Sequence, residues 1–169
     1  MEAKHIIELH FLRRELLDDI KQFAFVEADL MSDDGIHAKH QTFDIVEDGN
    51  IERVTRVLSL AFSECVEILY PYTKTPVEEL EVRDDTLISD IDYKIEMHVP
   101  GTYSKTTCDL LEKYIHEFLV CSALADWFSI TKPEASVNWK HKAEEAKDGI
   151  RGAKIRFTKK VRRGSSPFC

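Results

Sequence analysis

The sequence predicts a mainly helical α+β domain with a long antiparallel helical hairpin, a small β-hairpin and an extended basic C-terminal arm. Hydrophobic residues recur at three- and four-residue steps over most of the chain, which is the spacing of amphipathic helices. They alternate strictly with polar residues only over 93–99, and residues 158–169 show neither pattern. We therefore expect one domain over 1–157, with the β-hairpin near 78–99, followed by an arm over 158–169.

The N-terminal segment predicts a helix over residues 5–24. Apolar side chains recur there every three or four residues, and the charged residues fall outside the stripe that they form. The stripe consists of Leu9, Leu12, Leu16, Ile20 and Phe23. Residues 25–31 fit either an extension of this helix or a short strand. The weak pattern over 36–46 fits a loop that packs Phe43 and Ile45 inward.

A second helix is predicted over residues 51–70. The polar residues at 48–50 suit the start of a helix. Pro71 and Pro76 cannot continue a helix and so close it. The expected buried face consists of Val54, Val57, Leu58, Ala61, Phe62, Cys65, Ile68 and Leu69.

The strongest strand signal lies at residues 93–99. Four apolar residues alternate there with three polar ones, namely Tyr93, Ile95, Met97 and Val99 with Lys94, Glu96 and His98. A looser alternation over 78–88 predicts the partner strand, joined through a turn near Ser89 and Asp90. Because an isolated strand pair is marginally stable, we expect one face to pack on the helices or to be completed by a neighbouring subunit.

Two amphipathic patterns within 106–157 face each other across the break at 131–133. The first is rich in leucine and aromatic residues and the second in alanine, so small side chains in one helix fit against large ones in the other. Pro133 cannot continue the first helix but suits the first turn of the second. Trp127 and Trp139 are expected in the core between the two helices.

Hydropathy and cysteine usage indicate the cellular compartment in which the protein is expected. No apolar run approaches a membrane span, and the charges throughout residues 1–20 argue against a signal peptide, so we expect no membrane contact. The four cysteines form no C-x-x-C pair. Cys65 and Cys121 lie on helical patterns and are expected to be small buried hydrophobic residues, which fits a reducing cytosol.

No motif for catalysis, metal binding or cofactor binding is present. His37 and His40 are three residues apart, but no third ligand stands at a suitable spacing. Residues 101–106 precede a helix, yet they lack the second glycine of a phosphate-binding loop. We therefore predict that the chain is not an enzyme and uses neither a metal nor a cofactor. An enzyme with a dispersed site stays a minor alternative.

The net charge of −8 conceals a partition along the chain. Residues 1–139 hold 13 Lys or Arg and 28 Asp or Glu, whereas residues 140–169 hold 10 and 3. Such a partition can steer the basic end onto nucleic acid or onto another copy of the protein, although a solvated basic helix end is the simpler interpretation. The arm cannot bury itself. It is expected either to dock an aromatic anchor on another surface or to be a disordered terminus without a role.

Several features between residues 93 and 168 occur together: a strand ending in Val-Pro, a Leu-rich helix with Leu-Ala-Asp-Trp-Phe, a Lys-Pro-Glu turn, an Ala-rich helix and a basic tail ending in Ser-Pro-Phe. In these features the chain resembles a group of small virion proteins encoded by phages and prophages of Bacteroides-type bacteria. The resemblance implies a structural protein of the phage head–tail junction, in the connector, neck-ring or tail-completion class.

The resemblance further implies assembly in the host cytoplasm, as rings of about a dozen copies that become part of the virion. The expected partners are other copies of the chain and neighbouring portal, neck or tail proteins, with transient contact to DNA in the channel. The residues carried over are only candidates for contacts between subunits. They are Tyr93, Ile95, Met97, Val99, Lys159, Lys160, Arg162, Arg163, Pro167 and Phe168. The alternative is a cytosolic adaptor or regulatory protein whose basic arm binds nucleic acid or an acidic partner.

Overall fold

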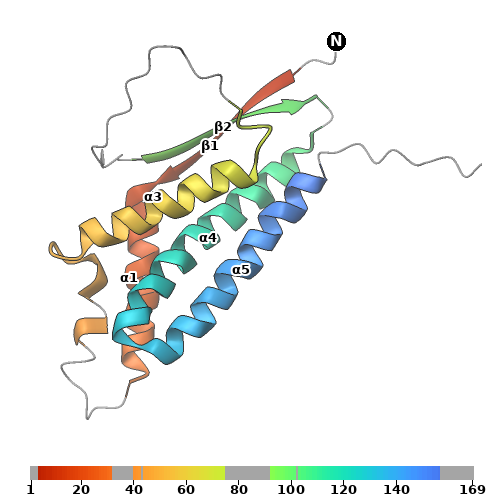
Figure 1. Cartoon of the computed structure of the whole chain (residues 1–169). Coiled ribbons are helices and arrows are strands. Elements are labelled where there is room, and N and C mark those ends of the chain that lie inside the picture. The colour runs from red at the N-terminus through yellow and green to blue at the C-terminus, as the bar shows by residue number, and fades with distance from the viewer. Residues whose placement is uncertain (1–3, 32–39, 43, 75–91, 102, 157–169) are drawn as a thin grey trace, which may run out of the picture.

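The computed structural model of the protein describes residues 4–31, 40–42, 44–74, 92–101 and 103–156. The elements in these ranges are β1 (Lys4–Leu12), α1 (Arg13–Asp29), the 3₁₀ helix η2 (Asp44–Val46), α3 (Ile51–Ile68), β2 (Asp92–Pro100), α4 (Lys105–Thr131) and α5 (Pro133–Ile155) (Figure 1). The predicted mainly helical α+β domain with a long antiparallel helical hairpin is confirmed, and its predicted small β unit is a two-stranded antiparallel sheet. The predicted arm over 158–169 lies outside the described residues.

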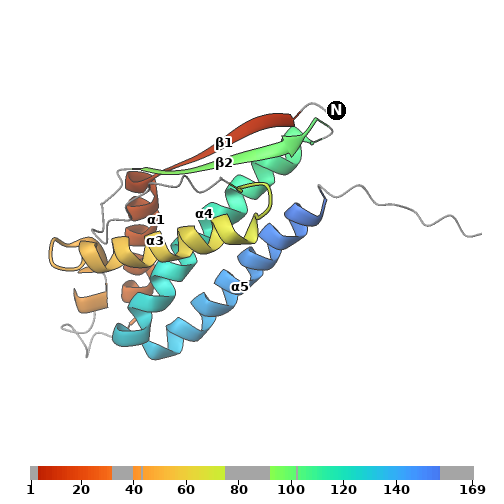
Figure 2. The same cartoon turned by 45° about the horizontal axis from the view of Figure 1, so that its top comes forward.

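Helix α4 is the centre of the helical layer, and α1, α3 and α5 pack around it (Figures 1 and 2). It accordingly buries residues on more than one side, as the wide apolar stripe in its sequence requires. The two strands lie along one side of the helices, beside α3 and the start of α4. The rings of Phe62 on α3 and Tyr93 on β2 meet there, with their centroids 5.1 Å apart.

The sheet consists of β1 and β2, which pair antiparallel from Lys4 opposite Pro100 to Leu12 opposite Asp92. The strand predicted at 93–99 is confirmed. Its partner among the described residues is β1, and the partner predicted at 78–88 lies outside them. The predicted helix over 5–24 is therefore wrong for residues 5–12.

The reason for this error is that β1 satisfies two periodicities. Leu9 and Phe11 are buried against the helices while Glu8 and His10 are exposed, which is the alternation of a half-buried strand. The helical interpretation relied on the spacing of Leu9, Leu12 and Leu16, but Leu12 is exposed. Helix α1 begins immediately after this strand, at Arg13.

Helix α1 buries one residue per turn, and these residues are Leu16, Ile20, Ala24 and Ala28. It continues to Asp29, which decides the ambiguous segment 25–31 in favour of a helical extension. Beyond it, Ile45 in η2 is buried, as predicted, whereas Phe43 lies outside the described residues. Helix α3 confirms the predicted second helix and ends two residues earlier than expected.

The pairing of α4 with α5 is the most extensive helix contact of the described residues and confirms the predicted helical hairpin. Pro133 occupies the first turn of α5, as expected. Trp127 and Trp139 are both buried, and their indole N–H groups donate to the Thr42 carbonyl at 2.8 Å and to the Glu27 carboxylate at 3.2 Å. Both residues therefore tie other segments to the hairpin.

Small residues allow α5 to lie close to α4. The buried seam of α5 consists of Ala135, Ser136, Trp139, Ala143, Ala146, Ile150 and Ala153. The Ser136 hydroxyl donates to the Ala125 carbonyl at 2.9 Å. Gly149 permits the closest approach, because a Cβ atom there would lie 2.7 Å from the Tyr114 ring.

Candidate functional site

The predicted subunit contacts on β2 lie in the core of the protein itself. Tyr93, Ile95, Met97 and Val99 point toward the helices, and none is more than 3% exposed. Their side chains are not available to a neighbouring subunit, which corrects that part of the interface prediction. An alternating pattern marks a strand with one buried face, but it does not say which molecule covers that face.

The backbone of β2 still offers an edge. The His98 N–H donates to the Tyr72 carbonyl at 2.8 Å and therefore points away from β1. Since amides alternate in direction along a strand, the N–H groups of Lys94 and Glu96 point the same way. A contact between subunits along this edge stays a prediction.

The predicted contacts in the arm lie outside the described residues. They are Lys159, Lys160, Arg162, Arg163, Pro167 and Phe168. The described end of α5, from which the arm continues, carries Arg151, Lys154 and Arg156. Arg151 is paired with Asp148 at 2.8 Å, on an exposed surface. Cations are favourable at this helix end, because the helix dipole places partial negative charge there.

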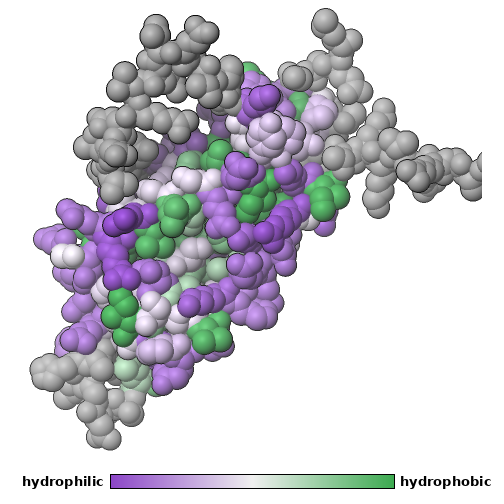
Figure 3. Space-filling model, viewed as in Figure 1, coloured by the Kyte–Doolittle hydropathy of each residue, from purple (hydrophilic) through white to green (hydrophobic). Residues whose placement is uncertain are grey.

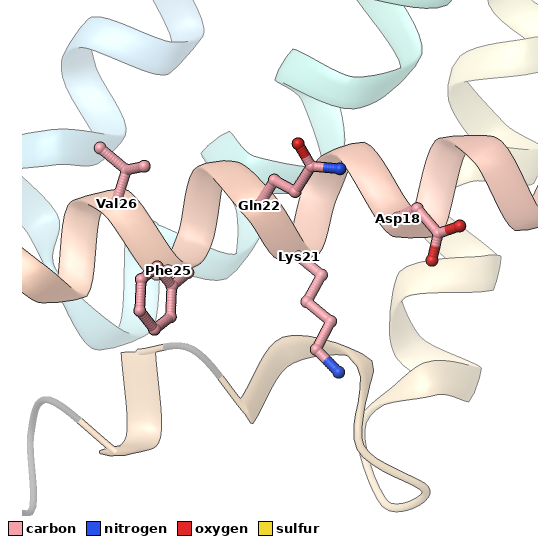
Figure 4. Close-up of a pocket in the computed structure, with 5 residues that line it drawn as sticks. All are labelled: Asp18, Lys21, Gln22, Phe25 and Val26. Atoms are coloured by element: carbon pink, nitrogen blue, oxygen red, sulfur yellow. The ribbon is translucent and has the colours of Figure 1, made fainter.

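A concave apolar surface on α1 was not predicted from the sequence. Asp18, Lys21, Gln22, Phe25 and Val26 line a hollow of about 510 Å³, which we call the α1 groove. Figure 4 shows Lys21 and Phe25 pointing toward the segment that contains η2. Phe25 is 60% exposed and Val26 56%, and their side chains project from different sides of the helix (Figure 4).

On the Val26 side of the helix, Leu30 is 75% exposed and lies one turn beyond Val26. A sequence signal for this exposure exists, because Phe25, Val26 and Leu30 fall outside the one-per-turn series that α1 buries. That signal becomes readable only once residues 25–29 are known to be helical. Contiguous exposed apolar surface of this kind commonly marks an interaction site.

A second concave surface lies where the C-terminal ends of α3 and α5 meet. This α3–α5 groove is lined by Glu67, Ile68, Pro71, Tyr72, Arg151, Lys154 and Ile155. Figure 3 shows hydrophobic surface over these adjoining helix ends, within a mostly hydrophilic face. The α1 groove and the α3–α5 groove are candidate docking surfaces; a smaller hollow of about 300 Å³ lies beside the α1 groove, lined by Arg13, Arg14, Leu17, Asp18 and Val46.

The two grooves differ in their surrounding charge. Residues 13–31 and 40–50, which form α1 and the segment around η2, hold eight carboxylates and three Lys or Arg. Residues 63–74 and 148–156, around the α3–α5 groove, hold three carboxylates and four Lys or Arg. The α1 groove thus lies on the acidic side of the molecule, and the α3–α5 groove on a slightly basic one.

Hydrogen bonds and ion pairs between polar side chains connect the helices that carry these surfaces. The Lys132 ammonium lies 2.9 Å from the Glu27 carboxylate, and the His116 ring lies 2.7 Å from Asp19, so both pairs link α1 to the helical hairpin. On α5, Lys147 pairs with Glu64 of α3. The hydrogen bond to Glu64 raises the pKa of Lys147 above its ordinary value, so this pair is charged at neutral pH.

The described residues show no reactive arrangement of side chains. No group of three His, Cys, Asp or Glu in this part of the chain is placed to hold a metal ion. Burial raises the pKa of Cys65 and of Cys121 to about 12, so both thiols are protonated and inert at neutral pH. That the chain is not an enzyme and binds no cofactor stays a prediction.

Comparisons with models of protein families, with curated proteins and with solved structures find no match to this chain. The resemblance to phage virion proteins therefore remains a basis for a proposal. Of the helices in the described ranges, none has the length and apolarity that crossing a bilayer requires.

Proposed function

We propose that the protein is a structural subunit of a phage head–tail junction, as a connector, neck-ring or tail-completion protein. It assembles in the host cytoplasm as a homo-oligomeric ring and becomes part of the virion beside portal, neck or tail proteins. The resemblance of residues 93–168 supports this class. The structural observation that carries the proposal is that acidic and basic residues lie on opposite sides of the described part of the subunit.

A ring of identical subunits needs a heterologous interface, in which one surface of each copy meets a different surface of the next. The basic C-terminal end of α5 and the acidic surface of α1 and η2 lie on opposite sides of the molecule (Figures 1 and 2). Two unlike surfaces on opposite sides favour head-to-tail association. They also leave the acidic remainder of the subunit free to line a channel, in which DNA meets few cations to adhere to.

The alternative function is a cytosolic adaptor whose basic arm binds nucleic acid or an acidic protein. It is favoured by the same charge partition, because the arm over 158–169 carries four Lys or Arg and no Asp or Glu. Against a dedicated nucleic-acid binder, the sequence pI is near 5.4.

Light scattering on the purified full-length chain, combined with electron microscopy of single particles, tests the proposal. We expect mass to rise with protein concentration and closed rings to appear, alone or after addition of phage portal rings. A matched full-length variant, Lys159→Glu with Lys160→Glu, Arg162→Glu and Arg163→Glu, should stay monomeric with unchanged helicity. A chain that stays monomeric in both conditions and shifts DNA in a gel would establish the adaptor instead.

The genes beside this one provide an independent test. A portal, capsid or tail gene as a neighbour is the expected result for a head–tail junction protein. Neighbouring genes that encode only transcription or metabolic proteins would contradict the proposed function and favour the adaptor.

A further inference from the structure

We propose that the α1 groove is the docking site for the C-terminal arm, residues 158–169, of a neighbouring copy of this chain. The inference rests on the proposed assembly and names the surface that receives the arm. Subunits could also assemble with the arm docked on another surface, so the docking site and the assembly are tested separately.

The apolar part of the groove fits the apolar part of the arm. Phe25 and Val26 line a hollow of about 510 Å³ and are each more than half exposed, and the exposed Leu30 lies one turn beyond Val26. The arm supplies an aromatic anchor, Phe168, immediately after Pro167. Buried aromatic anchors in such hollows contribute much of the binding energy of protein interfaces.

Charge selects between the two grooves. The arm carries four Lys or Arg and no carboxylate side chain. The α1 side holds eight carboxylates and three Lys or Arg, so it attracts the basic arm. The α3–α5 side holds three carboxylates and four Lys or Arg, so it does not. Within the α1 groove, the Asp18 side chain is 62% exposed and lies 3.9 Å from Arg14, a weak surface contact that leaves it accessible to the arm.

Geometry favours a neighbour over the same copy. Helix α5 ends on the side of the molecule opposite α1 and η2, as both views show (Figures 1 and 2). The 12-residue arm spans about 40 Å when fully extended, only slightly more than the length of α5, which is about 34 Å for 23 residues, so its own groove is within reach only of a nearly extended arm. To reach its own groove the arm would have to cross the helical layer, whereas head-to-tail packing brings the end of one copy directly to the groove of the next.

Photocrosslinking on the full-length chain tests where the arm docks. The photoreactive p-benzoylphenylalanine replaces Phe168, and ¹⁵N-labelled chains are mixed with unlabelled ones before irradiation and peptide mass spectrometry. We expect crosslinks from position 168 to residues 18–30 that join a labelled copy to an unlabelled one. Crosslinks within one copy, crosslinks to residues 67–72 or 151–155, or no crosslinks would each overturn the proposal.

Substitutions in the groove test its contribution to association. Val26→Asp and Asp18→Lys should each weaken self-association at least about tenfold, which corresponds to about 1.4 kcal/mol. The matched controls are Leu60→Asp, at a position on α3 that is 73% exposed, and Glu112→Lys, on the exposed face of α4. Both controls should associate like the wild type, and thermal unfolding should confirm that all four variants fold.

Mixing two defective variants tests the head-to-tail arrangement. The Val26→Asp chain keeps its arm, and the variant with four arm cations replaced by Glu keeps its groove. Together they can form one interface, so we expect a one-to-one complex that grows no further. If the arm variant is monomeric but Val26→Asp assembles normally, the α1 groove is not the docking site of the arm. The proposed assembly through the arm is then retained. If the wild type associates neither alone nor after addition of phage portal rings, both proposals are contradicted.

Discussion

At the scale of single residues, Gly149 and Gly152 stand on the same helix and differ only in what they face. A Cβ atom at Gly149 would lie 2.7 Å from the Tyr114 ring of α4, whereas nothing lies within 4 Å of such an atom at Gly152. Glycine normally destabilises a helix interior relative to alanine. At Gly149 this loss of helix stability is offset, because the missing side chain allows α4 and α5, the two longest helices of the described residues, to touch.

This contrast predicts opposite effects of one substitution. Gly149→Ala should lower the free energy of unfolding by about 1–3 kcal/mol, because the added methyl group must displace the Tyr114 ring in a packed interface. Gly152→Ala should raise it by about 0.5–1 kcal/mol through helix propensity alone. Urea unfolding followed by circular dichroism measures both. Equal effects of the two substitutions would show that Tyr114 does not set the spacing between the helices.

The buried thiol of Cys65 predicts how stability changes in alkali. Its pKa is raised by burial from 9.0 to about 12, so the folded protein holds this proton at pH values where the unfolded chain releases it. The contribution to stability is complete below about pH 9 and is lost as the pH rises toward 12, by at most about 1.4 kcal/mol per pH unit.

Replacing this thiol isolates its contribution. Cys65→Ala should reduce the slope of unfolding free energy against pH between about 9 and 12, which chemical denaturation at a series of pH values measures. Ser63→Ala, at an exposed position on the same helix, is the control and should leave the slope unchanged. An unaltered slope in the Cys65 variant would mean that the thiol also titrates normally in the folded state.

At the scale of elements, substitutions in β2 test whether its buried face packs on the protein's own helices. Met97→Ala should lower the free energy of unfolding by about 2–5 kcal/mol, because it leaves a cavity in the core. Lys94→Ala, on the exposed face of the same strand, should change it by less than about 0.5 kcal/mol. Denaturation at low protein concentration, where association is negligible, measures both. A stable Met97→Ala variant that only fails to associate would return this strand to the interface.

The helices could be predicted from the sequence because their periodicity is a local property. The apolar residues of α3, α4 and α5 recur every three or four positions, and Pro133 marks the break. Strand β1 could not be predicted in this way. Its residues satisfy both periods, and what decides between them is its pairing with β2, 80 to 96 residues further along the chain.

The candidate site likewise has one part that the sequence predicts and one part that depends on the fold. The basic arm can be recognised from its composition, since a run of cations beyond the last periodic residue needs no knowledge of the fold. The α1 groove depends on which sides of α1 the other helices and η2 leave uncovered, and only the folded structure contains that information. The strand residues of β2 were misassigned because their alternation reports burial and not the identity of the covering surface.

At the scale of the whole molecule, the distribution of charge predicts the kinetics of association. Attraction between the arm and the acidic α1 side should steer encounters over a range set by the Debye length, about 30 Å at 0.01 M salt and about 3 Å at 1 M. The association rate measured by stopped-flow light scattering should therefore fall steeply as salt is added. The four-cation arm variant provides the reference, and a rate independent of salt in the wild type would contradict electrostatic steering.

The long-range pairing of β1 with β2 also has a consequence for how the chain folds during synthesis. A ribosome adding about 5–20 residues per second needs on the order of 4–20 s to produce β2 after it has produced β1. Throughout that interval Ile7, Leu9 and Phe11 belong to a nascent segment without its native partner strand, which is the kind of segment that chaperones bind. Strand β1 thus reaches its final pairing only after β2 has been synthesised, although it precedes β2 by 80 to 96 residues.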